Sequence, residues 1–445
     1  MAILWAGCAC LTATAQDLDE PSPLLRHAHN VAFPAEEQPG TAPVLITDDS
    51  AQPYHLTLEE AKARTLESSV IMDLASLQVS AKCFALQAAR KDYLPKLLNS
   101  FSYFHFDSDL GTVVTTPGIF NPATSIAVPV IEQDSAIYTA AAIQPITPLL
   151  KVREAVNISA ADVGAAKAQQ NFARRELVKG VEQLYFGLLA TTRIRAGLEQ
   201  AVAGAQQMAA ASQSPDAQIS LVQAQQGLLS ADTQLVELTE QMNSLVDLPL
   251  GTQLELEEPP LPTMPFGTAD EAMAAAIASS PKLQEARRQV DKAEAALRLA
   301  HADYVPSVMA YGFYVNQNAT PTIQEDFTGV GLSATYLLEW GKKNDTYRAS
   351  KATVALARQN LRKEMQDASL NASKAFHAVN QAEQAFNYAQ QLASLNQQVQ
   401  PPAADPVALK AAMQARMEAA VAAIKAELDY RTAIVELQSI AGQTQ

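Results

Sequence analysis

Residues 57–95 read TLEEAKARTLESSVIMDLASLQVSAKCFALQAARKDYLP, and residues 268–306 read TADEAMAAAIASSPKLQEARRQVDKAEAALRLAHADYVP. The two stretches align without a gap at an offset of 211 residues (268 − 57 = 211). Both open on a Thr with a Glu three residues later, which is the capping box of a helix start, and both end in Asp-Tyr-Leu/Val-Pro. A repeat of this length indicates duplicated helical units, so the fold is predicted for each copy separately.

The repeat continues behind the proline at a smaller offset. Lys151 aligns with Lys342 at 191 residues (342 − 151 = 191), and Pro215 aligns with Pro406 at the same offset. The first copy therefore carries an insertion of 20 residues (211 − 191 = 20). Because residues 97–143 contain several Gly, Pro and Asn, the insertion is predicted to be a long exposed loop.

Composition excludes some classes of function. The chain has 445 residues, a formal net charge of −15 and no basic stripe, which disfavours binding to nucleic acid. Residues 1–15 are uncharged, mostly apolar and end in Ala-Thr-Ala, a pattern that predicts a signal peptide. Lipidation at Cys8 is the alternative for this segment. No apolar run of about 18 residues follows, so no transmembrane helix is predicted.

Five segments are predicted along the chain. They are a signal peptide at 1–15, a flexible arm at 16–53, a first structural repeat at 54–251, a linker at 252–267 and a second structural repeat at 268–442. Each repeat has the order helix, strand, strand, helix, helix, and the strands are predicted near 97–107, 135–146, 307–316 and 327–338.

The fold class is mainly α with β. The helix after Pro148 runs for about 60 residues, or roughly 90 Å, which predicts a rod with the strands at one end and Pro-containing turns at the other. Helices of this length cannot bury enough surface in a monomer, so we expect oligomerisation.

The strands suggest contact with outer-membrane lipid. Large apolar residues alternate with small or polar ones in the third and fourth strands, which is typical of transmembrane barrel strands. Four strands cannot close a barrel and open edges are not tolerated in lipid, so several protomers must contribute. An ordinary half-buried sheet is the alternative. The candidate lipid-facing residues are Met309, Tyr311, Phe313, Val315, Val330, Leu332 and Tyr336.

The order of the motifs resembles the TolC-type outer-membrane efflux proteins, also called outer membrane factors. The motifs that carry the resemblance are Tyr93-Leu94-Pro95, Gln144-Pro145-Ile146, Leu245-Val246-Asp247-Leu248-Pro249, Tyr304-Val305-Pro306 and Trp340-Gly341-Lys342. The resemblance implies a homotrimer whose strands form one barrel of 12 strands (3 × 4 = 12) in the outer membrane. It implies that the helices continue as an α-helical barrel in the periplasm, with an equatorial belt from the linker.

The resemblance also implies a function. The chain would be the passive exit duct of a tripartite efflux or type I secretion system, in which a periplasmic adaptor protein and an inner-membrane pump are partners. Docking of the adaptor would open the periplasmic tip. The alternative is a soluble periplasmic helical-hairpin protein that serves as an adaptor or scaffold.

The tip departs from the pattern of well-known members, in which two aspartates three residues apart help to close it. Those positions, counted back from Gly442, are Ala408 and Ala411 here. Closure is therefore expected to rely on packing at the Pro401–Pro406 turn, and Asp216 and Asp405 are either gate elements or residues that cap a turn. The candidate gate residues are Pro215, Asp216, Asp405, Pro406, Ala408 and Ala411.

No catalytic, metal or cofactor site is predicted. The six histidines are scattered, no Gly-rich phosphate loop is present, and the carboxylates alternate with Lys, Arg and Gln on solvated helix faces. We therefore do not expect an enzyme, and any energy would come from a partner.

Overall fold

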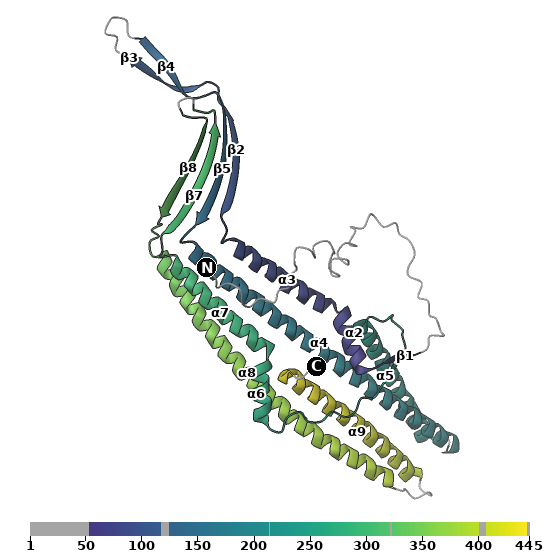
Figure 1. Cartoon of the computed structure of the whole chain (residues 1–445). Coiled ribbons are helices and arrows are strands. Elements are labelled where there is room, and N and C mark those ends of the chain that lie inside the picture. The colour runs from purple at the N-terminus through teal and green to yellow at the C-terminus, as the bar shows by residue number, and fades with distance from the viewer. Residues whose placement is uncertain (1–52, 117–123, 213, 321–322, 400–405, 443–445) are drawn as a thin grey trace, which may run out of the picture.

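The computed structural model describes residues 53–116, 124–212, 214–320, 323–399 and 406–442. It forms a rod with a sheet at one end and two helical hairpins at the other (Figure 1). The predicted signal peptide at 1–15, the Cys8 alternative and nearly all of the predicted arm at 16–53 lie outside the described residues.

The helices and strands follow one another in the order that the chain gives them. They are β1 (Tyr54–Leu56), α2 (Leu58–Ser68), α3 (Val70–Lys91), β2 (Lys96–His105), β3 (Leu110–Thr116), β4 (Thr124–Ile131), β5 (Asp134–Pro145), α4 (Leu149–Ser212), α5 (Pro215–Val246), β6 (Leu254–Leu256), α6 (Ala269–Ser279), α7 (Pro281–Ala302), β7 (Ser307–Gln317), β8 (Asp326–Thr335), α8 (Lys342–Gln398) and α9 (Pro406–Ala441).

The first helix of each predicted repeat is broken, which the sequence analysis did not predict. Ser69 separates α2 from α3, which meet at 49°, and Ser280 separates α6 from α7. Both serines have extended ψ angles, 115° and 120°. At Ser280 the cause is Pro281, since a proline disfavours helical geometry in the residue before it. The two breaks lie 211 residues apart (280 − 69 = 211), which is the offset of the sequence repeat.

A four-stranded antiparallel sheet closes one end of the rod. Its strand order is β2-β5-β7-β8, so residues from both halves of the chain alternate in it. The outer edges of β2 and β8 have no partner strand among the described residues. A sheet with two unpaired edges is incomplete as a membrane structure, because backbone groups need hydrogen-bond partners in lipid.

The insertion in the first copy is partly a β-ribbon rather than a loop. β3 pairs with β4 in antiparallel register, from Leu110 opposite Ile131 to Thr116 opposite Thr124. The prediction of a loop followed the Gly and Pro residues, but the run Thr112–Thr116 contains only β-branched residues and favours a strand. The ribbon projects past the end of the sheet (Figure 1).

Two hydrophobic clusters hold the middle of the rod together. One lies between α4, α5 and β1 around the fully buried Tyr185 and Met242, and the other lies between α6, α8 and α9 around Val379 and Leu437. Burying each such side chain contributes about 1.5–3 kcal/mol. Among the described helices, no single one has the length and hydropathy of a membrane span, although α2 and α3 meet that criterion as a bent pair.

Candidate functional site

The register of β7 and β8 decides which residues share a face of the sheet. Tyr311 lies opposite Gly331, whereas Val330 lies opposite Gly312. Residues directly opposite each other in antiparallel strands project to the same face. One face therefore holds Met309, Tyr311, Phe313 and Val315, and the other face holds Val330 and Leu332.

The two sets cannot both face lipid, so the prediction of one lipid-facing set is wrong. Alternation in each strand identified two faces correctly, but matching them across strands requires the register, and a shift of one residue exchanges the faces. Tyr336 follows the end of β8, and the Lys343 ammonium lies 4.2 Å from its ring centroid.

The face with Val330 is an exposed apolar band. A row of Leu97, Ala142, Gly312 and Val330 crosses all four strands, and its two ends, Leu97 and Val330, are 80% and 91% exposed. We call this face the Val330 face. An exposed apolar surface of this kind is typical of an interaction surface or a lipid contact.

Tyrosines border the Val330 face near the loops. The hydroxyl of Tyr103 donates to Asp134 at 2.7 Å, and the hydroxyl of Tyr314 donates to Asp326 at 2.6 Å. An apolar band that ends in tyrosines with polar partners matches the aromatic girdle of barrel proteins.

The opposite face is packed within the protomer by aromatic rings over glycines. A Cβ atom at Gly331 would lie 2.6 Å from Cζ of Tyr311, and one at Gly329 would lie 2.5 Å from Cζ of Phe313. The rings therefore occupy the space that larger residues on β8 would need. Covering a strand glycine with a cross-strand aromatic ring is a known way to stabilise a sheet.

The end of the rod far from the sheet contains most of the candidate gate residues. Pro215 begins α5 behind the N-cap Ser214, and Pro406 begins α9. The two hairpins are joined there, because the Lys410 ammonium donates to the backbone carbonyl of Asp216 at 3.3 Å. Ala408 and Ala411 lie in the first two turns of α9, whereas Asp405 and the rest of the Pro401–Asp405 turn lie outside the described residues.

Arg416 of α9 holds the end of α8. Its guanidinium donates to the carbonyls of Asn396 at 2.9 Å, Gln397 at 3.3 Å and Val399 at 2.5 Å. The last carbonyls of a helix lack partners within the helix, and α8 has no basic residue in its own last turn. The sequence analysis missed Arg416 and Lys410, although the basic residues in the first three turns of α9 were a usable signal.

The fold matches solved outer-membrane channels. The structures include the open state of the Neisseria gonorrhoeae MtrE outer membrane channel (15% identity, TM-score 0.70, 86% of this chain and 88% of that chain). They also include the Campylobacter jejuni CmeC outer membrane channel (14%, 0.69, 87% and 87%) and the outer membrane protein VceC of Vibrio cholerae (14%, 0.68, 86% and 96%). This chain has the TolC-type fold. No protein-family model and no curated protein matches the sequence.

The resemblance stated from the motifs is thus confirmed at the level of the fold. The TolC-type fold agrees with the predicted class, mainly helical with strands, and it supports an outer-membrane channel rather than an enzyme. Among the described residues, no group of three or more His, Cys, Asp or Glu side chains is placed to hold a metal ion.

An ionic cluster joins the helices of the TolC-type fold to the linker. Arg431 of α9 is 5% exposed, and its guanidinium lies 2.9 Å from Glu427 and 3.6 Å from Glu258. It also donates to the carbonyl of Pro259 at 3.1 Å. Arg193 of α4 pairs with the same two carboxylates and holds the pKa of Glu258 below its usual range. The cluster fixes α4, α9 and the linker relative to one another.

Tyr185 joins the first strand to the linker at the same level. Its buried hydroxyl lies 3.0 Å from the carbonyl of Leu56 and 2.5 Å from that of Glu257, and it can donate to either. Desolvation raises the pKa of Tyr185 to about 12, so the hydroxyl stays protonated at neutral pH.

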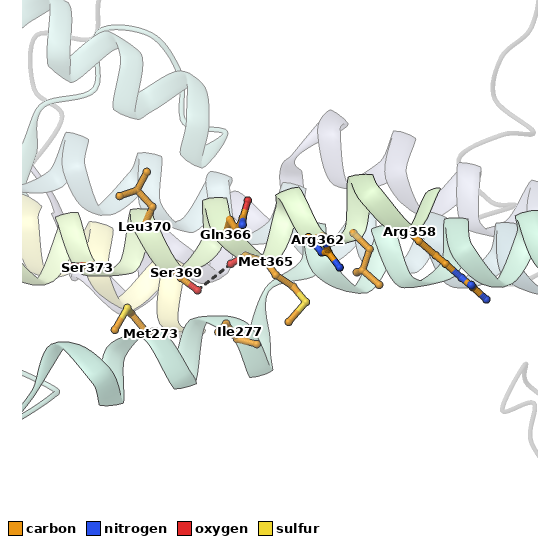
Figure 2. A pocket seen from close by; sticks show the side chains of 10 residues that line it. Met273, Ile277, Arg358, Arg362, Met365, Gln366, Ser369, Leu370 and Ser373 are labelled. Carbon is orange, nitrogen blue, oxygen red and sulfur yellow. Dashed lines mark hydrogen bonds between the residues drawn. The ribbon is translucent and has the colours of Figure 1, made fainter. Parts of the chain in front are cut away.

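A shallow groove of about 710 Å³ lies between α6 and α8. Figure 2 shows Met273 and Ile277 of α6 beside Met365 of α8, with Arg358 and Arg362 at one end. We call it the α8 groove. Methionine and aliphatic side chains adapt to apolar partners, so the groove suits a packing surface.

Proposed function

We propose that this chain is the passive outer-membrane exit duct of a tripartite efflux or type I secretion system. The observation that carries the proposal is the four-stranded sheet with an exposed apolar face and unpaired edges at β2 and β8. Three copies joined through these edges would close a barrel of 12 strands (3 × 4 = 12), and the helices would continue as a barrel in the periplasm.

In this arrangement the Val330 face meets lipid and the face with Tyr311 and Phe313 lines the barrel. The exposed row that ends in Leu97 and Val330 supports this assignment, as do the tyrosines at its border. Barrel strands place apolar residues outward and small or polar residues inward, and Gly329, Gly331 and Ser333 share the inner face.

Contacts between the helices of neighbouring protomers would complete the trimer. α3 and α8 lie on opposite edges of the rod (Figure 1). On α3, Val70, Leu74, Leu77 and Phe84 are each more than half exposed at helical spacing. We propose that this face packs into the α8 groove of the next protomer. Two different surfaces that meet in this way close a ring when the rotation allows it.

Gating would take place at the tip, where Lys410 and Arg416 replace the acidic pair of well-known members. In the closed state these cations hold the α4–α5 hairpin to α9 and α9 to the end of α8. Docking of a periplasmic adaptor would separate the hairpins and open the duct to an inner-membrane pump. The proposed gate region comprises Pro215, Asp216, Asp405, Pro406, Ala408 and Ala411.

Lys410→Ala is expected to favour the open tip. An exposed, charge-assisted hydrogen bond contributes about 1 kcal/mol, so its loss should raise the ratio of open to closed channels about fivefold. Single-channel recording in planar bilayers measures this ratio. Lys410→Arg keeps a donor and should behave as the wild type, and unchanged gating in Lys410→Ala would exclude this bond from the gate.

Mass and conductance of the detergent-extracted protein test the whole proposal. We expect a complex of three chains that inserts into planar bilayers and conducts ions. A water-soluble monomer that never conducts would overturn the proposal and support a periplasmic adaptor or scaffold instead.

A further inference from the structure

The β3–β4 ribbon is uncharged along its whole length. Residues 110–131 contain no Asp, Glu, Lys, Arg or His, although Asp107 and Asp109 precede them and Glu132 and Asp134 follow. An uncharged stretch bounded by four carboxylates is unusual in a chain with a net charge of −15, and the function proposed above does not use it.

The ribbon lies beyond the segment that lipid would cover. The strands of the sheet have 10 to 12 residues, which span about 25 Å when tilted by about 40°, and this equals the apolar height of an outer-membrane barrel. The four carboxylates mark the end of that band. The ribbon begins after them, so in the proposed channel it stands in water on the outer side of the membrane.

The base of the ribbon is held in a fixed direction. The backbone N–H of Glu132 donates to the carbonyl of Ala319 at 2.9 Å, and the N–H of Gln133 donates to the Asp109 carboxylate at 2.7 Å. The register shifts between Leu110 and Gly111, and a bulge of this kind bends a ribbon. Figure 1 shows that β3 and β4 turn away from the direction of β2 and β5.

The ribbon has open edges that need a partner. Among the described residues, β3 and β4 pair only with each other. A two-stranded ribbon is marginal in water, and an edge without charge invites pairing with another strand. β3 has seven residues and contains neither a charge nor a proline, so it lacks the devices that protect natural edges.

We propose that the β3 edge of each protomer pairs with β4 of the next and forms a collar of six strands over the outer mouth. This inference rests on the proposed trimer. Its occupant is a second copy of this chain because β3 continues β2, the edge strand at which neighbouring protomers would meet. Side chains already fill a barrel of about eight strands, so a six-stranded collar leaves no aqueous path. The collar is a second closure, separate from the periplasmic tip.

Removing the ribbon tests its role in closure. In the variant, two glycines replace Leu110–Ile131 between Asp109 and Glu132. We expect a trimer with several times the mean conductance of the wild type in planar bilayers. A trimeric variant with wild-type conductance would overturn the collar and leave the exit-duct proposal standing. If neither protein forms trimers or conducts, the exit duct and the collar both fail.

Cysteine pairing tests the contact itself. Thr112→Cys and Val128→Cys are placed in two separately tagged chains that both carry Cys83→Ser, and the chains are produced together. After mild oxidation we expect a disulfide-linked dimer of the two chains. Each variant alone is the control. The pair Thr112→Cys and Ile126→Cys covers a register shifted by two residues. Absence of both heterodimers in intact trimers would overturn the collar, as would a ribbon that lies on lipid headgroups.

Discussion

Arg431→Met is expected to lower the free energy of unfolding by about 3 kcal/mol, at the lower end of the range for breaking a buried ion pair. The guanidinium is 5% exposed and contacts two carboxylates and the carbonyl of Pro259. Removing it leaves Glu427 with one cationic partner instead of two. The lower end of the range applies because Arg193 still pairs with Glu427 and Glu258.

Arg358→Met is the matched control for this prediction. Arg358 also pairs with a glutamate, Glu294 at 2.8 Å, but its side chain is 64% exposed. Solvated pairs contribute about 0–1 kcal/mol. Guanidinium chloride unfolding of the detergent-extracted protein, followed by helical circular dichroism, compares the two variants. Equal losses would show that the buried cluster does not lock the helices to the linker.

Val330→Lys is expected to destabilise the barrel by about 2–4 kcal/mol, since a lysine at the middle of the lipid face must be desolvated. Val315→Lys is the matched substitution on the other face of the same sheet, where the side chain would meet the water of the channel. We expect this second variant to fold and to shift ion selectivity towards anions.

Unfolding from lipid vesicles measures the first effect and reversal potentials in planar bilayers measure the second. If Val315→Lys is the more damaging substitution, the two faces are assigned the wrong way round. The comparison is sharp because the sequence analysis placed both valines on the lipid side.

Much of the fold could be predicted because punctuating residues mark the ends of its elements. Pro215 begins α5, and the residue before α8 is Gly341 with a φ of 82°. The break at Ser69 could not be predicted in the same way, because the residues around it are ordinary helix formers. Tertiary packing decides such breaks, and local propensity does not.

The candidate sites were harder to predict than the fold because they depend on pairs of residues far apart in the chain. The two faces of the sheet follow from the register of β7 against β8, which alternation alone leaves open. At the tip, Lys410 meets a backbone carbonyl 194 residues away, and a carbonyl has no sequence signature. Searching for an acidic pair directed attention to Ala408 and Ala411 and away from the neighbouring cations.

The rings over Gly329 and Gly331 make two positions on β7 dependent on two positions on β8. A larger residue at 331 needs a smaller one at 311, and the same exchange links 329 with 313. Relatives of this chain should therefore conserve the summed volume of each pair rather than either residue. An engineer who wishes to reshape the pore should change both members of a pair together, and single changes there should be rejected far more often than double ones.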